Sequence, residues 1–209
     1  MNPYARVRDI VRRSKAGEGV IHWNPGKFLQ LQPDFDIHLN FWGNPFTGMG
    51  AGVSPCHTHD YGFTSEVVFG CVVNVRMDVA PVEEYPTRRV NREHMMFRKY
   101  RIIDAVGDNS FDEFVPSPDL YTILRSRLEE VRAGNTYQMD PRDWHASISV
   151  APAITLLDMW KHAPIPYYTL GPVDVRQAYP TSDRRTTPDQ LPAVWDYVDG
   201  MLKLAGIEL

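Results

Sequence analysis

The chain has 209 residues, of which 43% are hydrophobic and 23% charged, and its formal net charge is −4 at pH 7. These values are typical of one globular domain over residues 1–209, and they exclude the basic surface that nucleic acids or anionic membranes bind. No apolar run is long enough to span a bilayer, and residues 1–15 carry arginines without the apolar core of a secretory signal. We therefore expect a cytoplasmic protein with no nucleic-acid or membrane partner. Two cysteines, Cys56 and Cys71, are too few for a disulfide framework.

The first third of the chain predicts one helix followed by strands. Apolar residues recur at helical spacing in residues 4–15, with arginines on the other face. Residues 18–31 read as strand, turn and strand, and residues 37–42 alternate as a strand does. His38 lies on the polar face of that strand. We interpret it as an exposed or hydrogen-bonded histidine rather than a metal ligand.

The middle of the chain predicts further strands around a long insertion. Residues 66–79 are rich in valine and form a strong strand candidate, in which Gly70 marks a turn or bulge. Residues 80–120 form the insertion, with a strand at 95–105. The segment Asp119–Val131 fits either an amphipathic helix or two short strands, and its β-rich surroundings favour strands.

The last third predicts three strands and one helix. The strands span residues 137–141, 146–150 and 154–161, with turn residues between them. Residues 189–204 follow an N-capping threonine and carry a helical stripe of apolar side chains. That stripe predicts a packing face.

A histidine pair dominates the functional reading. His57 and His59 are two residues apart, so in an extended strand their imidazoles point to the same face. Such a pair is spaced to bind one metal ion, and His145 is the distant third partner. Cys56 precedes the pair and by the same alternation faces away from it.

These residues resemble the two motifs of the cupin superfamily. The first motif matches Gly52, His57-Thr58-His59 and Gly70, and the second matches Gly134, Pro141 and His145. The resemblance implies an all-β, jelly-roll barrel of cupin type, here with short N-terminal and C-terminal helices. It also implies one divalent transition metal on His57, His59 and His145.

The chain departs from the family pattern at two places. The family glutamate is expected four or five residues after His59, where Phe63 and Thr64 stand. Glu66 comes later, and simple alternation puts it on the outer face unless a bulge turns it inward. Its role as a fourth ligand stays open. In the second motif, Asp143 replaces a glycine.

Three neutral imidazoles suit Fe(II) first, with Zn, Ni or Mn as alternatives, and they leave the charge of the ion uncompensated. Such a site favours an anionic substrate. Three-histidine cupins resemble thiol dioxygenases and diketone-cleaving dioxygenases. We therefore predict a mononuclear non-haem Fe(II) dioxygenase acting on a small anionic organic molecule. A metal-dependent isomerase, lyase or hydrolase, or a non-catalytic binding protein, is the alternative, and the resemblance leaves a homodimer open.

Candidates for further catalytic roles are Asp158, His162 and Tyr61. Asp158 and His162 share one face of a late strand, and an inward face would let them move protons or orient a ligand histidine. Tyr61 follows the histidine pair and could act as an acid, although packing is its alternative role. Arg76 could anchor a substrate carboxylate, with an exposed arginine as the alternative.

Overall fold

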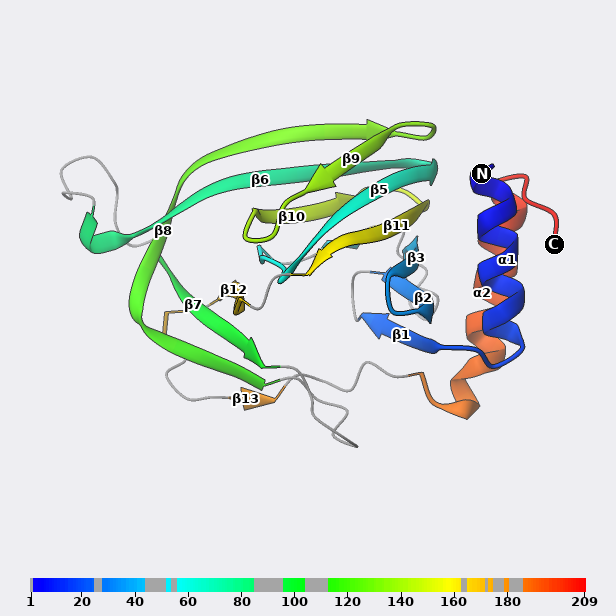
Figure 1. Ribbon diagram of the computed structural model, residues 1–209, viewed down its shortest axis with the longest axis horizontal. Coiled ribbons are helices and arrows are strands. Elements are labelled where there is room, and N and C mark those ends of the chain that lie inside the picture. The colour runs from blue at the N-terminus through cyan, green and yellow to red at the C-terminus, as the bar shows by residue number, and fades with distance from the viewer. Residues whose placement is uncertain are drawn as a thin grey trace.

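The computed structural model describes residues 2–24, 28–43, 52–53, 56–84, 96–103, 113–162, 165–171, 173–174, 179–180 and 186–209. Two helices lie side by side against one end of a body of curled, antiparallel strands (Figure 1). Every pairing among the described strands is antiparallel. The predicted all-β fold with a helix near each end is therefore confirmed.

One sheet has the strand order β1-β2-β3-β11-β5-β9. Its strands are β1 (Val20–Asn24), β2 (Phe28–Asp34), β3 (Ile37–Trp42), β5 (Tyr61–Phe69), β9 (Thr136–Met139) and β11 (Ala153–His162). The helices α1 (Pro3–Lys15) and α2 (Leu191–Leu204) pack on its outer face, with the short η3 (Pro188–Gln190) before α2. Both helices appear where the apolar periodicity predicts them.

The other sheet has the order β12-β7-β8-β6-β10-β4, with β13 paired to β8. Its strands are β4 (Gly52–Val53), β6 (Cys71–Pro81), β7 (Met96–Ile103), β8 (Glu113–Arg132), β10 (Trp144–Ser149), β12 (Tyr167–Gly171) and β13 (Tyr179–Pro180). The turn η1 (Val82–Glu84) follows β6. The long strands β6 and β8 run together along the body (Figure 1).

Strand alternation divides the apolar residues of the first sheet between two cores. One face contributes Leu31 and Leu39 to a cluster that includes Val7 of α1 and Val198 of α2. The opposite face contributes to a second cluster that also takes residues of the other sheet. That cluster comprises Trp42, Phe63, Val67, Val72, Val131, Tyr137, Met139, Ala153 and Leu157. This second cluster therefore fills part of the space between the two sheets with packed apolar side chains.

The structure refines two predictions about the middle of the chain. The segment Asp119–Val131 is neither a helix nor two short strands, because it is part of the single 20-residue strand β8. Pairing with β6 along most of this length keeps it extended despite its helix-like spacing. The predicted insertion, residues 80–120, is in its described parts the end of β6, the turn η1, β7 and the start of β8, which extend the second sheet. Residues 85–95 and 104–112 lie outside the described chain.

Gly70 connects β5 of one sheet to β6 of the other with a φ of 77°. A Cβ at this position would lie 2.4 Å from the carbonyl oxygen of Pro152. Both the left-handed backbone and the close approach require glycine. The family glycine therefore marks the crossing between the two sheets. Among the described residues, neither helix is both long and apolar enough to cross a membrane.

Candidate metal centre

Backbone pairing brings His57 to His145 across the second sheet. The His57 N–H donates to the His145 carbonyl at 2.9 Å, and the His145 N–H donates to the His57 carbonyl at 3.0 Å. On its other side His57 pairs with Thr169 of β12. The histidine segment therefore fills the position between β10 and β12, and this long-range pairing positions the third histidine beside the first two.

The three imidazoles meet at one point. One ring nitrogen from each of His57, His59 and His145 lies within 4.8 Å of the other two. The Nε2 atoms of His57 and His59 are 3.1 Å apart, and the ring centroids of His57 and His145 are 4.6 Å apart. The structure thus brings together the three residues that the sequence predicts as metal ligands.

These nitrogens fit a transition-metal ion. A tetrahedral ion about 2.0–2.1 Å from each imidazole nitrogen separates its ligand atoms by about 3.3 Å. The separation of 3.1 Å between Nε2 of His57 and Nε2 of His59 is close to that edge length. An imidazole-only donor set suits iron, zinc, copper or nickel.

The rings of His59 and His145 are held in the neutral form that a metal ligand needs. Burial, and then the neighbouring His57 and His145, lower the pKa of His59 well below its usual value of 6.5. Burial likewise lowers the pKa of His145, against a smaller opposing effect of the Asp143 carbonyl. Neutral rings keep a lone pair for an ion at neutral pH.

A backbone contact fixes which nitrogen of His145 faces the cluster. Its Nδ1 lies 3.0 Å from the carbonyl oxygen of Asp143. A carbonyl only accepts hydrogen bonds, so Nδ1 carries the proton and Nε2 offers the lone pair. The turn that carries Asp143 therefore sets the tautomer of the third ligand.

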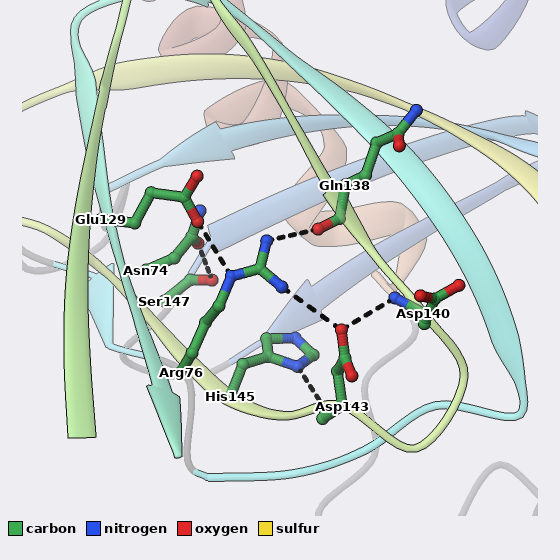
Figure 2. Close-up of polar contacts among 8 residues, drawn as sticks. All are labelled: Asn74, Arg76, Glu129, Gln138, Asp140, Asp143, His145 and Ser147. Carbon is green, nitrogen blue, oxygen red and sulfur yellow. Dashed lines mark hydrogen bonds and ion pairs between the residues drawn. The ribbon is translucent and has the colours of Figure 1, made fainter. Parts of the chain in front are cut away.

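Arg76 braces that turn (Figure 2). Its guanidinium donates to Glu129 at 2.9 Å, to Asp143 at 3.3 Å and to the Gln138 carbonyl. The Asp143 carboxylate also accepts from the Asp140 N–H at 3.0 Å. Arg76 thus cross-links β6, β8 and the β9–β10 turn directly behind His145. Sequence reasoning identified Arg76 only as a candidate anchor for substrate, because contacts across 67 residues leave no periodic signal.

Aromatic rings close one side of the cluster. The His59 ring centroid is 4.5 Å from that of Tyr61 and 5.4 Å from that of Phe63. Phe63 also lies 6.0 Å from the His145 ring. Tyr61 is therefore beside the histidines, as its candidacy requires, and its catalytic role stays a prediction.

Asp158 is not brought to the histidines. Its carboxylate forms two hydrogen bonds with the guanidinium of Arg6 in α1, on the helix-covered face of the first sheet. Leu156, two residues earlier, belongs to the same helix-facing core. The inward face that a catalytic role would require is therefore not the face of Asp158, because alternation along β11 turns the odd-numbered residues inward. The backbone of His162 pairs with Tyr61, but its side chain lies outside the described structure, and its role stays a prediction.

Glu66 lies on the same outer face as Val68, which packs in the helix-facing core. The Arg6 pKa is raised mainly by Asp158 and in smaller part by Glu66, which places Glu66 near α1. The cluster of possible ligands found in the described chain consists of the three histidines alone. Alternation along β5 turns Glu66 away from the histidines, so Glu66 is not a fourth metal ligand. Burial raises the pKa of Cys56 to about 12, so this residue stays a thiol.

A buried polar chain near the site escaped sequence reasoning. His38 is 7% exposed, and its Nδ1 lies 3.1 Å from Gln30, which donates to Asn40 at 2.9 Å. His38 is also near enough to His59 to help lower the pKa of His59. The alternation of polar and apolar residues in 37–42 was the sequence signal that could have identified this polar chain. It places polar side chains inward here, rather than toward solvent.

Two curled antiparallel sheets carry the three gathered histidines, which is the arrangement that the paired motifs predict. No protein-family model matches the chain, and a search of curated proteins found no match.

Solved structures show distant likenesses. Hydroquinone 1,2-dioxygenase from Sphingomonas sp. TTNP3, with 4-hydroxybenzoate bound, matches with a TM-score of 0.34 and 10% identity over 67% of this chain and 68% of that chain. Hydroquinone 1,2-dioxygenase PnpCD, in complex with Cd²⁺ and 4-hydroxybenzonitrile, matches with a TM-score of 0.32 and 11% identity. That match covers 74% of this chain and 70% of the other chain. Oxalate decarboxylase from Bacillus subtilis matches with a TM-score of 0.32 and 10% identity over 91% of this chain and 39% of that chain. Likeness at this level assigns no reaction.

Proposed function

We propose that this protein is a mononuclear metal-dependent enzyme, with Fe(II) as the metal, that catalyses a dioxygenase reaction on a small anionic organic molecule. The observation that supports the proposal is the group of three imidazoles whose ligand atoms lie within 4.8 Å of one another. The proposal includes a cytoplasmic location. A homodimer stays a prediction.

The donor set supports the choice of substrate charge. Three neutral ligands leave the 2+ charge of an ion uncompensated, so an enolate, phenolate or carboxylate binds there more favourably than a neutral molecule. Bound Fe(II) would supply open coordination positions and redox chemistry with dioxygen.

The surrounding residues determine the properties of this site. The Asp143 carbonyl keeps the proton on Nδ1 of His145, so Nε2 faces the ligand position. Phe63 is 3% exposed and packs against two of the histidine rings, which excludes water from that side. Tyr61 lies against His59 and is the nearest candidate to hydrogen-bond a substrate oxygen.

Metal content and oxygen uptake together test the proposal. Protein purified without chelator is analysed for metals and then assayed in an oxygen electrode with thiols, diketones and phenolic acids. We expect near-stoichiometric iron and substrate-dependent oxygen uptake. Zinc or nickel without uptake would instead favour an isomerase, lyase or hydrolase, and no metal would leave a binding protein.

Three variants connect the metal to the histidines. His57→Ala and His145→Ala are each expected to lose the metal while circular dichroism stays that of a folded β protein. Asp158→Asn is the matched control, because this carboxylate faces α1, and it is expected to keep the metal. Full metal occupancy in both histidine variants would refute the site.

A further inference from the structure

A polar pocket of about 420 Å³ lies next to the turn between β9 and β10, and no histidine lines it. It is formed where β6, β8 and the start of β10 meet, and it includes the two residues that precede His145. Three arginines, two aspartates and a tryptophan contribute to its wall: Arg76, Arg125, Arg127, Asp78, Asp143 and Trp144. The volume is large enough for a small organic acid.

The strand register connects this pocket to the histidines. Arg127 is directly opposite Arg76, Arg76 is opposite His145, and His145 is paired with His57. Residues directly opposite in antiparallel strands share a face, so these four side chains form one row across the sheet. Two strand spacings of about 4.8 Å put the backbone of Arg127 about 10 Å from that of His145. A molecule that joins Arg127 to His145 therefore has to reach about 10 Å, past Arg76.

The charges in the row are not balanced at its outer end. Arg76 is neutralised by Glu129 and Asp143, at 2.9 and 3.3 Å. Asp78 stands opposite Arg125 in the register. Arg127 is exposed, has no ion pair within the described part of the chain, and faces another arginine.

We propose that Arg127, together with Arg125 two residues away on the same face, binds a carboxylate group of the substrate. A guanidinium recognises a carboxylate with two parallel hydrogen bonds, which a ligand can offer to Arg127. The inference rests on the proposed function, and it narrows the substrate to an elongated organic acid. Its carboxylate lies at Arg127 and its reacting group at the histidines.

Binding to metal-free protein tests the pocket separately from the chemistry. Chelator-treated protein is titrated with benzoate and with its neutral isostere benzamide, and NMR follows the indole N–H of Trp144, assigned with Trp144→Phe. We expect saturable binding of benzoate and at least tenfold weaker binding of benzamide. Arg127→Gln should weaken benzoate binding about tenfold or more, as the loss of a charge-assisted pair does.

Two further variants sharpen the result. Arg132→Gln removes the same charge from the same strand outside the pocket, and it should bind benzoate as the unmodified protein does. Arg127→Glu should lose benzoate and gain benzylammonium. Equal affinity of Arg127→Gln and the unmodified protein for benzoate, equal affinity for benzoate and benzamide, or no saturable shift would each overturn the inference. Loss of the proposed function would show instead as absent metal or oxygen uptake.

Discussion

Replacing Arg76 by methionine tests whether the brace behind His145 supports the metal site. The change keeps the aliphatic part of the side chain and removes the contacts to Glu129, Asp143 and the Gln138 carbonyl. The Asp143 carboxylate then keeps its contact with the Asp140 N–H but loses its side-chain partner, while the Asp143 carbonyl still has to orient His145. We expect both a less stable protein and a weaker metal site.

The magnitude follows from how exposed these contacts are. The side chains of Arg76 and Glu129 are each 31% exposed and that of Asp143 is 40% exposed, so each ion pair is screened and contributes about 0.5–1 kcal/mol. The hydrogen bond to the Gln138 carbonyl adds about 1 kcal/mol. The free energy of unfolding should fall by about 2–3 kcal/mol, which lowers Tm by roughly 4–12 °C in a domain of this size.

Metal affinity should fall by about tenfold. Loss of a group that orients a metal-ligating histidine costs about 10–100-fold, and Arg76 acts through Asp143 rather than on the ring itself. Thermal melts with chelator and a competitive metal titration measure the two effects separately. Arg76→Lys should recover part of both, whereas Arg132→Met, at a side chain that is 76% exposed, should change neither. An Arg76→Met protein with unchanged Tm and metal affinity would refute this reasoning.

Two further predictions concern stability. The pKa of His38 is lowered by burial from 6.5 to about 4, so the unfolded chain binds a proton below pH 6.5 that the folded protein does not bind until about pH 4. The free energy of unfolding should therefore fall by about 3 kcal/mol as pH drops from 6.5 to about 4. Denaturant titrations with chelator should show that His38→Gln removes this part of the loss. Parallel pH profiles of stability for the two proteins would contradict the prediction. Gly70→Ala should lower the free energy of unfolding by more than about 2 kcal/mol, since the added Cβ would meet the Pro152 carbonyl. Gly134→Ala should lower it by only about 1 kcal/mol, because Gly134 has a φ of 86° but no heavy atom within 4 Å of an added Cβ. Equal losses in the two glycine variants would show that the crowding at Gly70 is unimportant.

Local patterns explain which parts of the fold were predictable. The helices Pro3–Lys15 and Leu191–Leu204 follow from apolar residues three and four apart, because each helix buries one stripe on the sheet. The meeting of His57, His59 and His145 followed from alternation and the motif resemblance. Neither required knowledge of distant contacts.

Long-range pairing explains what was missed. The β8 strand has a spacing that also fits a helix, and only its ladder with β6 decides between them. Asp158 was assigned to the wrong face because β11 is apolar on both faces: Leu156 packs toward the helices and Leu157 between the sheets. A strand that is buried on both sides has no alternation from which to read its inner face.

The charges of the site narrow the chemistry more than the fold does. Burial keeps His59 and His145 neutral, so a bound divalent ion retains its full charge. The proposed anchor Arg127 is a second cation in the same row, with Arg76 and its two carboxylate partners between Arg127 and the histidines. A molecule with one acidic group can pair with either the bound metal ion or Arg127, whereas a molecule with an acidic group at each end can pair with both. We therefore expect affinity to rise sharply from neutral to singly to doubly acidic ligands, and screening by salt should weaken the contact at the exposed Arg127 more than the contact at the less exposed histidines.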